Sequence, residues 1–214
     1  MFFLAFDIGG SKYLARCNKD YTFLINNIQI ISNAFEVLKK AEIKFIFVSS
    51  YLAENKDHSY GILKKIGEHF TSSLGGLVVR LYNVFGNEDV SYKSHVIPDL
   101  IYQARTQKCI KLNTKGTEER QFLYIEDCCE GLYVISQNYF ELLKHNSNID
   151  LSSFEWISIK NIAEIIGRIL GCGVEYSKNR AEFLVKVNPN KLVLDYWYPK
   201  TSVEEGIIKL INEY

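Results

Sequence analysis

The sequence predicts an α/β protein built on a parallel sheet with helices on its faces. Two observations lead to this prediction. Short apolar runs that end in glycine or serine alternate with longer segments of helical periodicity, and this order of strand and helix holds from residue 2 to residue 86. Apolar residues make up 47% and charged residues 23% of 214 residues, which is typical of a globular domain. Strands joined through helices pair in parallel by right-handed crossovers.

The alternating elements begin at the N-terminus. The run FFLAF at 2–6 is apolar throughout and is followed by DIGG, which predicts a central strand buried on both faces and closed by a glycine loop. Residues 20–41 have apolar positions at helical spacing, with Asp20 placed as the cap and lysines in the last turn. The elements that follow are a buried strand at 44–50, a helix at 59–74 and a strand at 76–86.

After Gly86 the regular alternation ends. A helix is expected at 95–106, and a short strand followed by a helix in the stretch 121–139. The next helix, at 158–171, ends at Gly171. The closing stretch TSVEEGIIKLINEY has Thr201 or Ser202 as its cap, with a glutamate three residues later.

Charge, cysteines and hydropathy narrow the possible partners. Lysine plus arginine (25) balances aspartate plus glutamate (25), which favours a small-molecule or protein partner over nucleic acid or an anionic membrane. No signal peptide and no run of 18 apolar residues is found, so we expect a cytoplasmic protein. We expect reduced, mostly buried cysteines and no metal site, because no CxxC pair occurs among Cys17, Cys109, Cys128, Cys129 and Cys172.

Tyr60 and Lys64 lie four residues apart at the start of the second long helix, and therefore on one helix face. Ionising a tyrosine at neutral pH needs a pKa shift of about 3 units, roughly 4 kcal/mol, which a nearby ammonium can supply. The phenolate would then accept a proton from a substrate hydroxyl. Ser49 or Ser50, at the end of the preceding strand, would orient that hydroxyl. The spacing alone is common by chance, so the pair needs other motifs beside it.

Several further stretches stand in a fixed order: DIGG, FIFVSS, SYGILK, RLYNVFG, SHVIPDLI, GTEERQFLYIED and YWYPKTSVEEGI. Together they resemble the extended short-chain dehydrogenase/reductase family, the NAD-dependent epimerases and dehydratases that act on nucleotide sugars. SYGILK is similar to the family's YxxxK motif, RLYNVFG to its RxxNVYG segment and YWYPKTSVEEGI to its closing GWxPxxSLEEGL. DIGG resembles the GDP-sugar epimerase and reductase branches.

The resemblance implies a Rossmann-like fold and a role for each matching residue. Tyr60 would be the acid/base, Lys64 its electrostatic partner and a ligand of the nicotinamide ribose, and Ser50 the residue that orients the substrate hydroxyl. NAD or NADP would lie near Ala5, Phe6, Asp7, Asn27, Ser49, Lys64, Asn83 and Val84. A nucleotide-diphosphate sugar would contact Asn83, His95, Val96 and Arg120.

For three of these residues a purely structural role is the alternative. Asn27 and Asn83 would equally well hold loop backbone by hydrogen bonds. Arg120 would equally well form a surface ion pair with Glu118 or Glu126.

The resemblance also implies a division into two domains. Residues 1–90 would form a partial cofactor-binding domain, and residues 91–214 a mainly substrate-binding lobe from which strands and helices return to the first domain. A homodimer through the helices at 20–41 and 59–74 is expected by analogy.

The family's glycine-rich turn, G-x-x-G-x-x-G after the first strand, has no counterpart here, so the sheet is expected to lack its first strands and to expose the strand at 2–6 as an edge. Loss of that turn argues against tight cofactor binding and against activity of this chain. A gene fragment is the preferred explanation, ahead of a shortened inactive relative and one half of a split protein.

Leu52 stands where epimerases and dehydratases often carry threonine, glutamate or cysteine. A second acid/base is therefore absent, which favours a 4-epimerase or 4-reductase over a 4,6-dehydratase or 3,5-epimerase. The rival function is a non-catalytic binding or assembly module that offers its edge strand to a partner chain.

Overall fold

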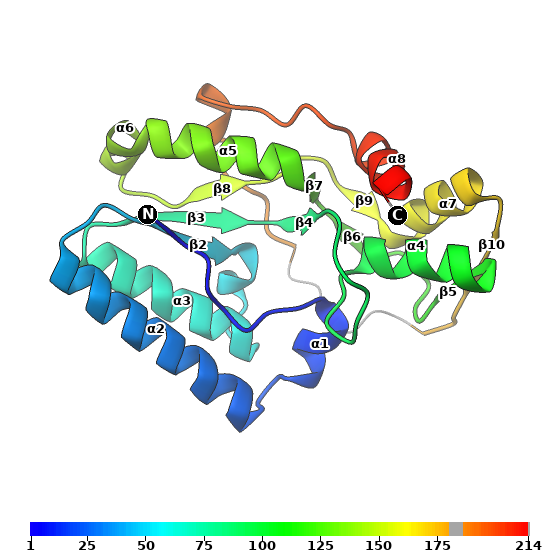
Figure 1. Cartoon of the computed structure of the whole chain (residues 1–214), viewed down its shortest axis with the longest axis horizontal. Helices are drawn as coiled ribbons and strands as arrows, with labels where there is room; N and C mark the ends of the chain where they lie inside the picture. The colour runs from blue at the N-terminus through cyan, green and yellow to red at the C-terminus, as the bar shows by residue number, and fades with distance from the viewer. Residues whose placement is uncertain (180–185, 214) are drawn as a thin grey trace.

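A four-stranded parallel sheet forms the centre of the computed structural model, which describes residues 1–179 and 186–213 (Figure 1). The strand order is β1–β2–β3–β8, and every neighbouring pair is parallel. These strands are β1 (Phe2–Phe3), β2 (Ile46–Ser50), β3 (Leu77–Leu81) and β8 (Ile149–Leu151). One face is covered by α2 (Tyr21–Ala41) and α3 (Ser59–Ser73), the other by α5 (Ile125–Gln137) and α6 (Tyr139–Lys144) (Figure 1). The predicted α/β class with a parallel sheet is confirmed.

The remaining strands of the described residues form three two-stranded sheets beyond the carboxyl ends of the central strands. These are parallel β4 (Asn83–Phe85) with β7 (Phe122–Tyr124), parallel β5 (Cys109–Leu112) with β10 (Gly173–Tyr176), and antiparallel β6 (Glu119–Arg120) with β9 (Ile157–Ser158). The helices on this side are α4 (Val96–Gln107), α7 (Ile159–Leu170) and α8 (Val203–Glu213) (Figure 1). Shorter elements are α1 (Ser11–Arg16) and the 3-10 turns η1 (Tyr51–Glu54) and η2 (Leu192–Asp195).

Helix boundaries follow the local signals in the sequence. Asp20 caps α2, since its Oδ1 accepts a hydrogen bond from the Phe23 backbone N at 2.7 Å. Gly171 ends α7 with φ of 64°, a left-handed conformation that suits glycine. Ser202 and Glu205 form a reciprocal capping box at the start of α8, with bonds of 3.2 and 2.8 Å. Tyr214, the last letter of the closing stretch, lies outside the described residues.

Three hydrophobic clusters fix the arrangement. The first, which includes Phe35, Phe47 and Leu63, fills the space between the sheet and the α2–α3 pair. The second lies between the opposite face of the sheet and α5–α6. The third packs α4, α7 and α8 against the small sheets, with side chains such as Ile97 and Ile207 removed from water. The small sheets and these helices therefore form a second packed region beside the central sheet.

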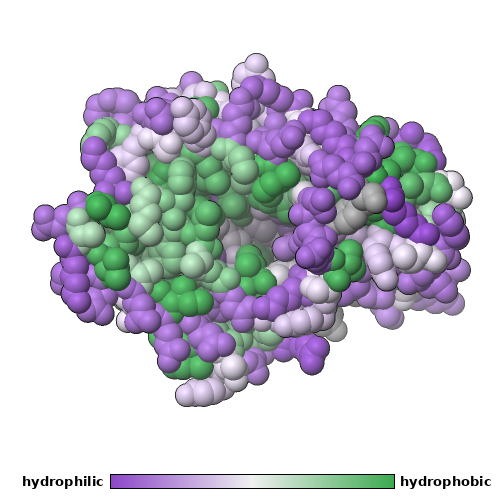
Figure 2. All heavy atoms as spheres, in the orientation of Figure 1, coloured by the Kyte–Doolittle hydropathy of each residue, from purple (hydrophilic) through white to green (hydrophobic). Residues whose placement is uncertain are grey.

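The first strand differs from its prediction. β1 covers only Phe2–Phe3 and lies at the edge of the sheet, so the expectation of a strand buried on both faces is wrong. Phe2 is 39% and Leu4 59% exposed, and Figure 2 shows an apolar surface over the front of the sheet. The edge position itself is what the resemblance implied. Apolar letters alone cannot separate a central strand from an edge strand, because that depends on neighbours elsewhere in the chain.

Other elements also depart from the predictions. The expected strand at 76–86 is two strands, because the chain leaves β3 at Tyr82 and its continuation, β4, pairs with β7 instead. The sequence reading missed α1, which is too short to show a helical period. Only Cys128 is buried and Cys129 is exposed, so the expectation of mostly buried cysteines is wrong.

Within residues 1–179 and 186–213, no helix has both the length and the apolar character needed to cross a membrane. In the same residues, no three histidine, cysteine, aspartate or glutamate side chains gather as metal ligands would.

Candidate functional site

Tyr60 and Lys64 lie on the face of α3 that packs against β2. His58 is the N-cap of this helix, and its Nδ1 accepts a hydrogen bond from the Tyr60 backbone N at 3.2 Å. The side chains of both residues point inward, with Tyr60 2% and Lys64 4% exposed. Ser50, the last residue of β2, forms a hydrogen bond with the Tyr60 side chain. The structure therefore brings together the three residues predicted as catalytic.

The ammonium of Lys64 is held inside the protein. Its Nζ donates a hydrogen bond of 2.8 Å to the Val48 carbonyl oxygen and lies 3.8 Å from the centre of the Phe6 ring. Burial lowers the pKa of Lys64 to about 7, although the nearby Glu68 carboxylate acts in the opposite direction. Lys64 is thus a mixture of charged and neutral forms at neutral pH.

The electrostatics of Tyr60 differ from the expectation. Burial raises the pKa of the Tyr60 phenol, and the hydrogen bond with Ser50 lowers it only in part. The Lys64 ammonium is directed at the Val48 carbonyl and the Phe6 ring and lies 5.7 Å from the centre of the Tyr60 ring, so its stabilisation of the phenolate stays a prediction. In this conformation Tyr60 is a protonated group, able to donate a proton.

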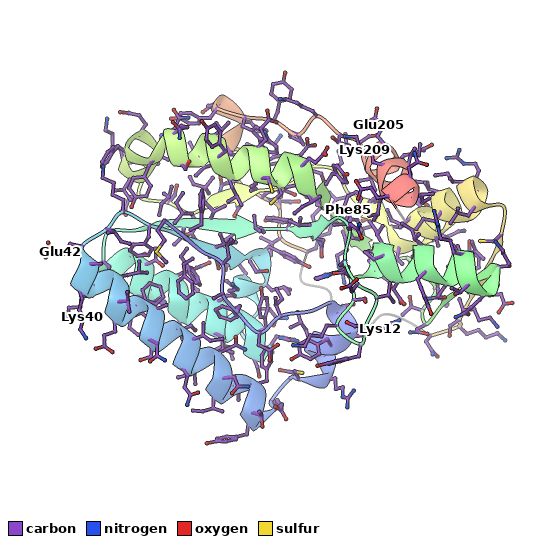
Figure 3. The ribbon with its side chains drawn as sticks, viewed as in Figure 1. Lys12, Lys40, Glu42, Phe85, Glu205 and Lys209 are labelled. Atoms are coloured by element: carbon purple, nitrogen blue, oxygen red, sulfur yellow. The ribbon has the colours of Figure 1, made fainter. Side chains whose placement is uncertain are left out.

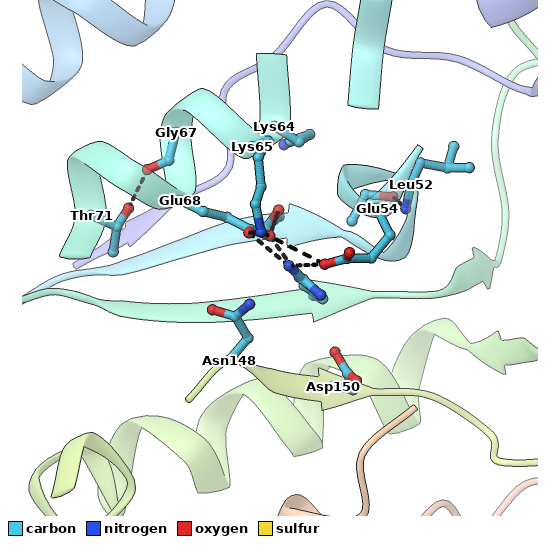
Figure 4. Close-up of polar contacts among 12 residues, drawn as sticks. Leu52, Glu54, Lys64, Lys65, Gly67, Glu68, Thr71, Asn148 and Asp150 are labelled. Carbon is cyan, nitrogen blue, oxygen red and sulfur yellow. Dashed lines mark hydrogen bonds and ion pairs between the residues drawn. The ribbon is translucent and has the colours of Figure 1, made fainter. Parts of the chain in front are cut away.

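Ser49 belongs to a buried ionic network beneath this site. Its Oγ donates a 2.7 Å hydrogen bond to Glu68 Oε1. Glu68 also accepts two hydrogen bonds from the guanidinium of Arg80, from Nε at 2.7 Å and Nη2 at 2.8 Å. Glu54 and Lys65 complete the network: Glu54 pairs with Arg80 at 2.6 Å and Lys65 with Glu68 at 3.1 Å, and Figure 4 shows Glu54, Lys65 and Glu68 close together. The Ser49 hydroxyl is therefore committed to Glu68, whereas the hydroxyl of Ser50 faces Tyr60.

The loop after β1 is held by Asn27 and by two side chains outside the sheet. The Asn27 side chain accepts from the Asp7 backbone N at 2.8 Å and donates to the Phe23 carbonyl at 3.0 Å, so it holds backbone of the loop and of α2, and its contact with a cofactor stays a prediction. The Asp7 carboxylate accepts from Tyr13 Oη at 2.8 Å and from Lys93 Nζ at 2.7 Å. Burial would raise the pKa of Asp7, but these two partners lower it overall. Ala5 lies exposed in the same loop.

A pocket of about 200 Å³ lies beyond the carboxyl ends of the strands. The strand β4 contributes Asn83 and Val84, and the start of α4 contributes His95 and Val96. Arg120 of β6 lines the same pocket. All four residues predicted to contact a substrate therefore meet here. Tyr60, Ser50 and Lys64 are not in its lining.

One wall of this pocket is built by the segment that the sequence reading missed. The Gly10 backbone N donates a 2.7 Å hydrogen bond to the Lys93 carbonyl, and a Cβ on Gly10 would lie 2.1 Å from the Ser94 carbonyl oxygen. Lys12 of α1 reaches α4, where its Nζ lies 2.8 Å from Asp99 (Figure 3). Glycine is required at position 10 because the two backbones approach so closely.

Hydrogen bonds fix the polar residues of the pocket. His95 Nδ1 lies 2.8 Å from Glu88 Oε2, and Glu88 also accepts from the His95 backbone. Arg120 donates to the Glu119 carbonyl at 3.0 Å. The surface ion pairs weighed for Arg120 are not formed within the described part of the chain: Glu126 pairs with Lys209 instead.

Tyr51 joins the pocket to the acid/base group. Its ring stacks on Tyr82 with the centres 4.9 Å apart, and its hydroxyl donates a long hydrogen bond of 3.5 Å to Asn83 Oδ1. Burial raises the pKa of Tyr51, while Arg120 and Asn83 lower it; Tyr51 in turn raises the pKa of Tyr60. Tyr51 thus interacts with Arg120 and Asn83 of the pocket on one side and acts on Tyr60 on the other.

The sequence reading missed Tyr51, Glu68, Arg80 and Lys12. Glu68 carried a signal that could have found it, because it follows Lys64 by four residues and continues the same helix face. Arg80 stands in RLYNVFG, but nothing in the sequence connects it to a residue 12 positions earlier.

The chain is similar to a known protein family and to several curated proteins. Residues 8–149 match the model of the NAD dependent epimerase/dehydratase family. Among curated proteins, GDP-L-fucose synthase of Sinorhizobium fredii is 30% identical over 160 residues, which cover 71% of this chain and 48% of that protein. The UDP-glucuronic acid decarboxylase 1 of Arabidopsis thaliana is 22% identical, and the match covers 64% of this chain and 32% of that protein. The chain thus spans half or less of the length of these relatives.

Solved structures share the fold. An epimerase from Methanothermobacter thermautotrophicus superposes with a TM-score of 0.80 at 23% identity, and the match covers 99% of this chain and 70% of that chain. At these values the likeness shows a common fold of the Rossmann type.

Proposed function

The chain belongs to the NAD dependent epimerase/dehydratase family, and from this premise we propose that it carries the acid/base group and the nucleotide-sugar pocket of a hydride-transfer enzyme. The observation that supports this proposal most strongly is the meeting of Tyr60, Ser50 and Lys64 at the carboxyl end of β2. In open parallel sheets this end of the strands is where ligands bind.

Tyr60 would exchange a proton with a hydroxyl of the sugar. Because the pKa of its phenol is raised, it starts as the acid and would deliver its proton to a developing alkoxide. Ser50, already hydrogen-bonded to Tyr60, would orient the same sugar oxygen. In the opposite direction Tyr60 would accept the proton, and Lys64 in its ammonium form would stabilise the phenolate.

The residues at the Tyr60 end of the site offer hydrogen-bond donors suited to a nicotinamide cofactor, NAD or NADP. The cofactor fits there only after one side chain has moved. When bound it would supply the acceptor or donor of the hydride. Lys64, Asn83, Val84 and the Ala5–Asp7 backbone would hold it. The Phe6 ring covers the Lys64 ammonium, so contact between Lys64 and a ribose requires the Phe6 side chain to turn away. Ser49 and Asn27 would act on the cofactor indirectly, through the elements they hold.

The pocket between β4, β6 and α4 would take the nucleotide diphosphate and its sugar. Arg120 would pair with a phosphate, and His95 and Val96 would add contacts from the first turn of α4, whose N-terminal end favours anions. Asn83 lies between this pocket and Tyr51, so it would contact both substrate and cofactor.

The reaction proposed is oxidation and reduction at one sugar carbon, as in a 4-epimerase or 4-reductase. Leu52 in η1 supplies no second acid/base at the position where a dehydratase or 3,5-epimerase would need one.

A second candidate function is supported by the free edge of β1. Among residues 1–179 and 186–213 this strand pairs only with β2, and Phe2 within it and Leu4 just after it are exposed. In this candidate the chain is an assembly module whose edge takes a strand from a partner chain. We also propose a homodimer through α2 and α3, whose exposed apolar side chains include Ile28, Ile62 and Phe70.

Nicotinamide fluorescence tests the proposal. NADH or NADPH would be added to purified protein up to millimolar concentration. Separate titrations would be run without a nucleotide and with UDP-glucose, UDP or GDP. A saturable change in emission that is enhanced by a nucleotide sugar is expected. Absence of any change at millimolar cofactor would contradict the enzymatic proposal for this chain and would favour the assembly candidate.

A further inference from the structure

Glu68 is almost completely buried, yet it serves no predicted role in substrate or cofactor contact. It is 4% exposed and lies on α3 four residues after Lys64 and eight after Tyr60, so the three side chains share one helix face. A buried carboxylate is costly unless charged partners and hydrogen bonds compensate it. The partners of Glu68 therefore indicate what its burial achieves.

Those partners come from two strands of the sheet. Ser49 of β2 and Arg80 of β3 hold the carboxylate by three hydrogen bonds of 2.7 to 2.8 Å, one from Ser49 and two from Arg80. The geometry of the Arg80 contacts is bidentate, which fixes direction as well as distance. In consequence α3 is tied to two neighbouring strands at the turn directly after Lys64, and its rotation about its own axis is restricted.

Near Lys64, two carboxylates and two cations meet on one side of α3, and their charges cancel. Glu68 and Lys65 come from the helix itself, Glu54 from η1 and Arg80 from β3. The positive charge of Arg80 is neutralised by Glu54 and Glu68 together, with Arg80 Nη2 2.6 Å from Glu54 Oε1. On the other side, the loop after β1 contributes the Phe6 ring, and β2 contributes the Val48 carbonyl. The Tyr60 ring lies 5.7 Å from Lys64 Nζ, and the buried Asp150 of β8 interacts electrostatically with Arg80, Glu68 and Glu54.

We propose that Glu68 is a positioning residue: it locks the helix face that carries Tyr60 and Lys64 onto the tips of β2 and β3, and its charge, one helical turn after Lys64, favours the ammonium form of that lysine. The proposal rests on the proposed roles of Tyr60 and Lys64. The direction of the Glu68 effect agrees with it, because the Glu68 carboxylate raises the pKa of Lys64 against the effect of burial.

Direct titration of Lys64 tests this proposal without any substrate. Lysine labelled with ¹³C at Cε would be followed by NMR as a function of pH, and the Lys64 resonance would be assigned with Lys64→Arg. In Glu68→Gln the pKa of Lys64 should fall by about one unit or more from its starting value. The matched control is Glu54→Gln, which removes the more exposed carboxylate of the same network and should leave the pKa of Lys64 nearly unchanged.

Glu68→Asp distinguishes the effect of the carboxylate charge from the effect of its hydrogen bonds. It also provides a test if the Glu68→Gln protein does not fold. The shorter side chain retains the charge but cannot reach Ser49 and Arg80 together. We expect the pKa of Lys64 to stay near its wild-type value, while the amide hydrogens of α3 around Lys64 exchange at least about tenfold faster with solvent. An unchanged exchange rate in Glu68→Asp would overturn the positioning role.

An unchanged pKa of Lys64 in Glu68→Gln, or an equal fall in Glu54→Gln, would overturn the electrostatic role. These outcomes are independent of catalysis. If the cofactor titration described above fails while Lys64 responds as expected, the function proposed for the chain is wrong and the role of Glu68 in the structure stands.

Discussion

The Nζ atom of Lys64 lies 3.8 Å from the centre of the Phe6 ring, which covers the ammonium from the loop after β1. The ring shields the ammonium from water and from ligands alike. Burial of this kind is the main reason why the pKa of Lys64 falls to about 7.

Phe6→Ala should open the site. With the ring removed, water reaches the ammonium, so the pKa of Lys64 should rise by about one unit or more toward its usual value. The affinity for NADH should increase, because the ring no longer has to move. NMR titration and fluorescence measure the two effects, and Phe70→Ala, on the exposed side of α3, serves as control. A lower pKa of Lys64 in Phe6→Ala would contradict the role given to this ring.

Lys64→Met should change how stability depends on pH. The folded pKa of Lys64, about 7, lies below the ordinary value of 10.5, so between these values the unfolded chain binds a proton that the folded chain lacks. The wild-type protein therefore gains stability as pH rises through this window, and loses it as pH falls.

Between pH 6 and pH 10 the free energy of unfolding of the wild-type protein should rise by about 4 kcal/mol relative to that of Lys64→Met. Urea denaturation at both pH values measures this difference. Lys65→Met, which removes a partly exposed amine, should show no comparable dependence. Parallel pH profiles for the wild type and Lys64→Met would mean that Lys64 is not buried as described.

Arg120→Ala should weaken the binding of nucleotide diphosphates. A charge-assisted hydrogen bond contributes about 1.5–3 kcal/mol, which corresponds to roughly a 10- to 100-fold loss of affinity. Isothermal titration with UDP and with GDP measures it. Lys144→Ala on α6 removes the same charge far from the pocket and should bind as the wild type does. Equal affinities in Arg120→Ala and wild type would exclude a phosphate contact at this position.

Gly10→Ala should damage the pocket wall. The new Cβ would lie 2.1 Å from the Ser94 carbonyl oxygen, so the loop before α4 must move. We expect a loss of about 1–3 kcal/mol in the free energy of unfolding, together with weaker UDP binding. Gly173→Ala is the matched control, since its Cβ meets no atom within 4 Å. A Gly10→Ala protein as stable as the control would contradict the close approach of the two segments.

The parts of the fold that follow local rules could be predicted from the sequence. Asp20 caps α2, and Ser202 with Glu205 forms the predicted capping box, because these signals act within three or four residues. The edge position of β1 and the break at Tyr82 depend on which strands pair, and pairing is set by contacts between distant segments.

The candidate site shows the same division. Tyr60, Lys64 and Ser50 could be found because a motif and a strand end bring them together. The protonated state of Tyr60 could not be predicted, because burial depends on side chains such as Phe6 that arrive from a different loop. The contact between Lys12 and Asp99 spans 87 positions and has no local signature.

Comparison of turnover between wild type and Tyr60→Phe tests the central claim most directly. The protein would be incubated with NAD and with UDP-glucose or a GDP-hexose, and the sugar product analysed by mass spectrometry and NMR. The wild-type protein should convert one of these sugars. Tyr60→Phe should lose activity by about 100-fold or more while it still binds NADH, since only the proton transfer is removed. Equal turnover by the two proteins would contradict the role of Tyr60 as the acid/base group.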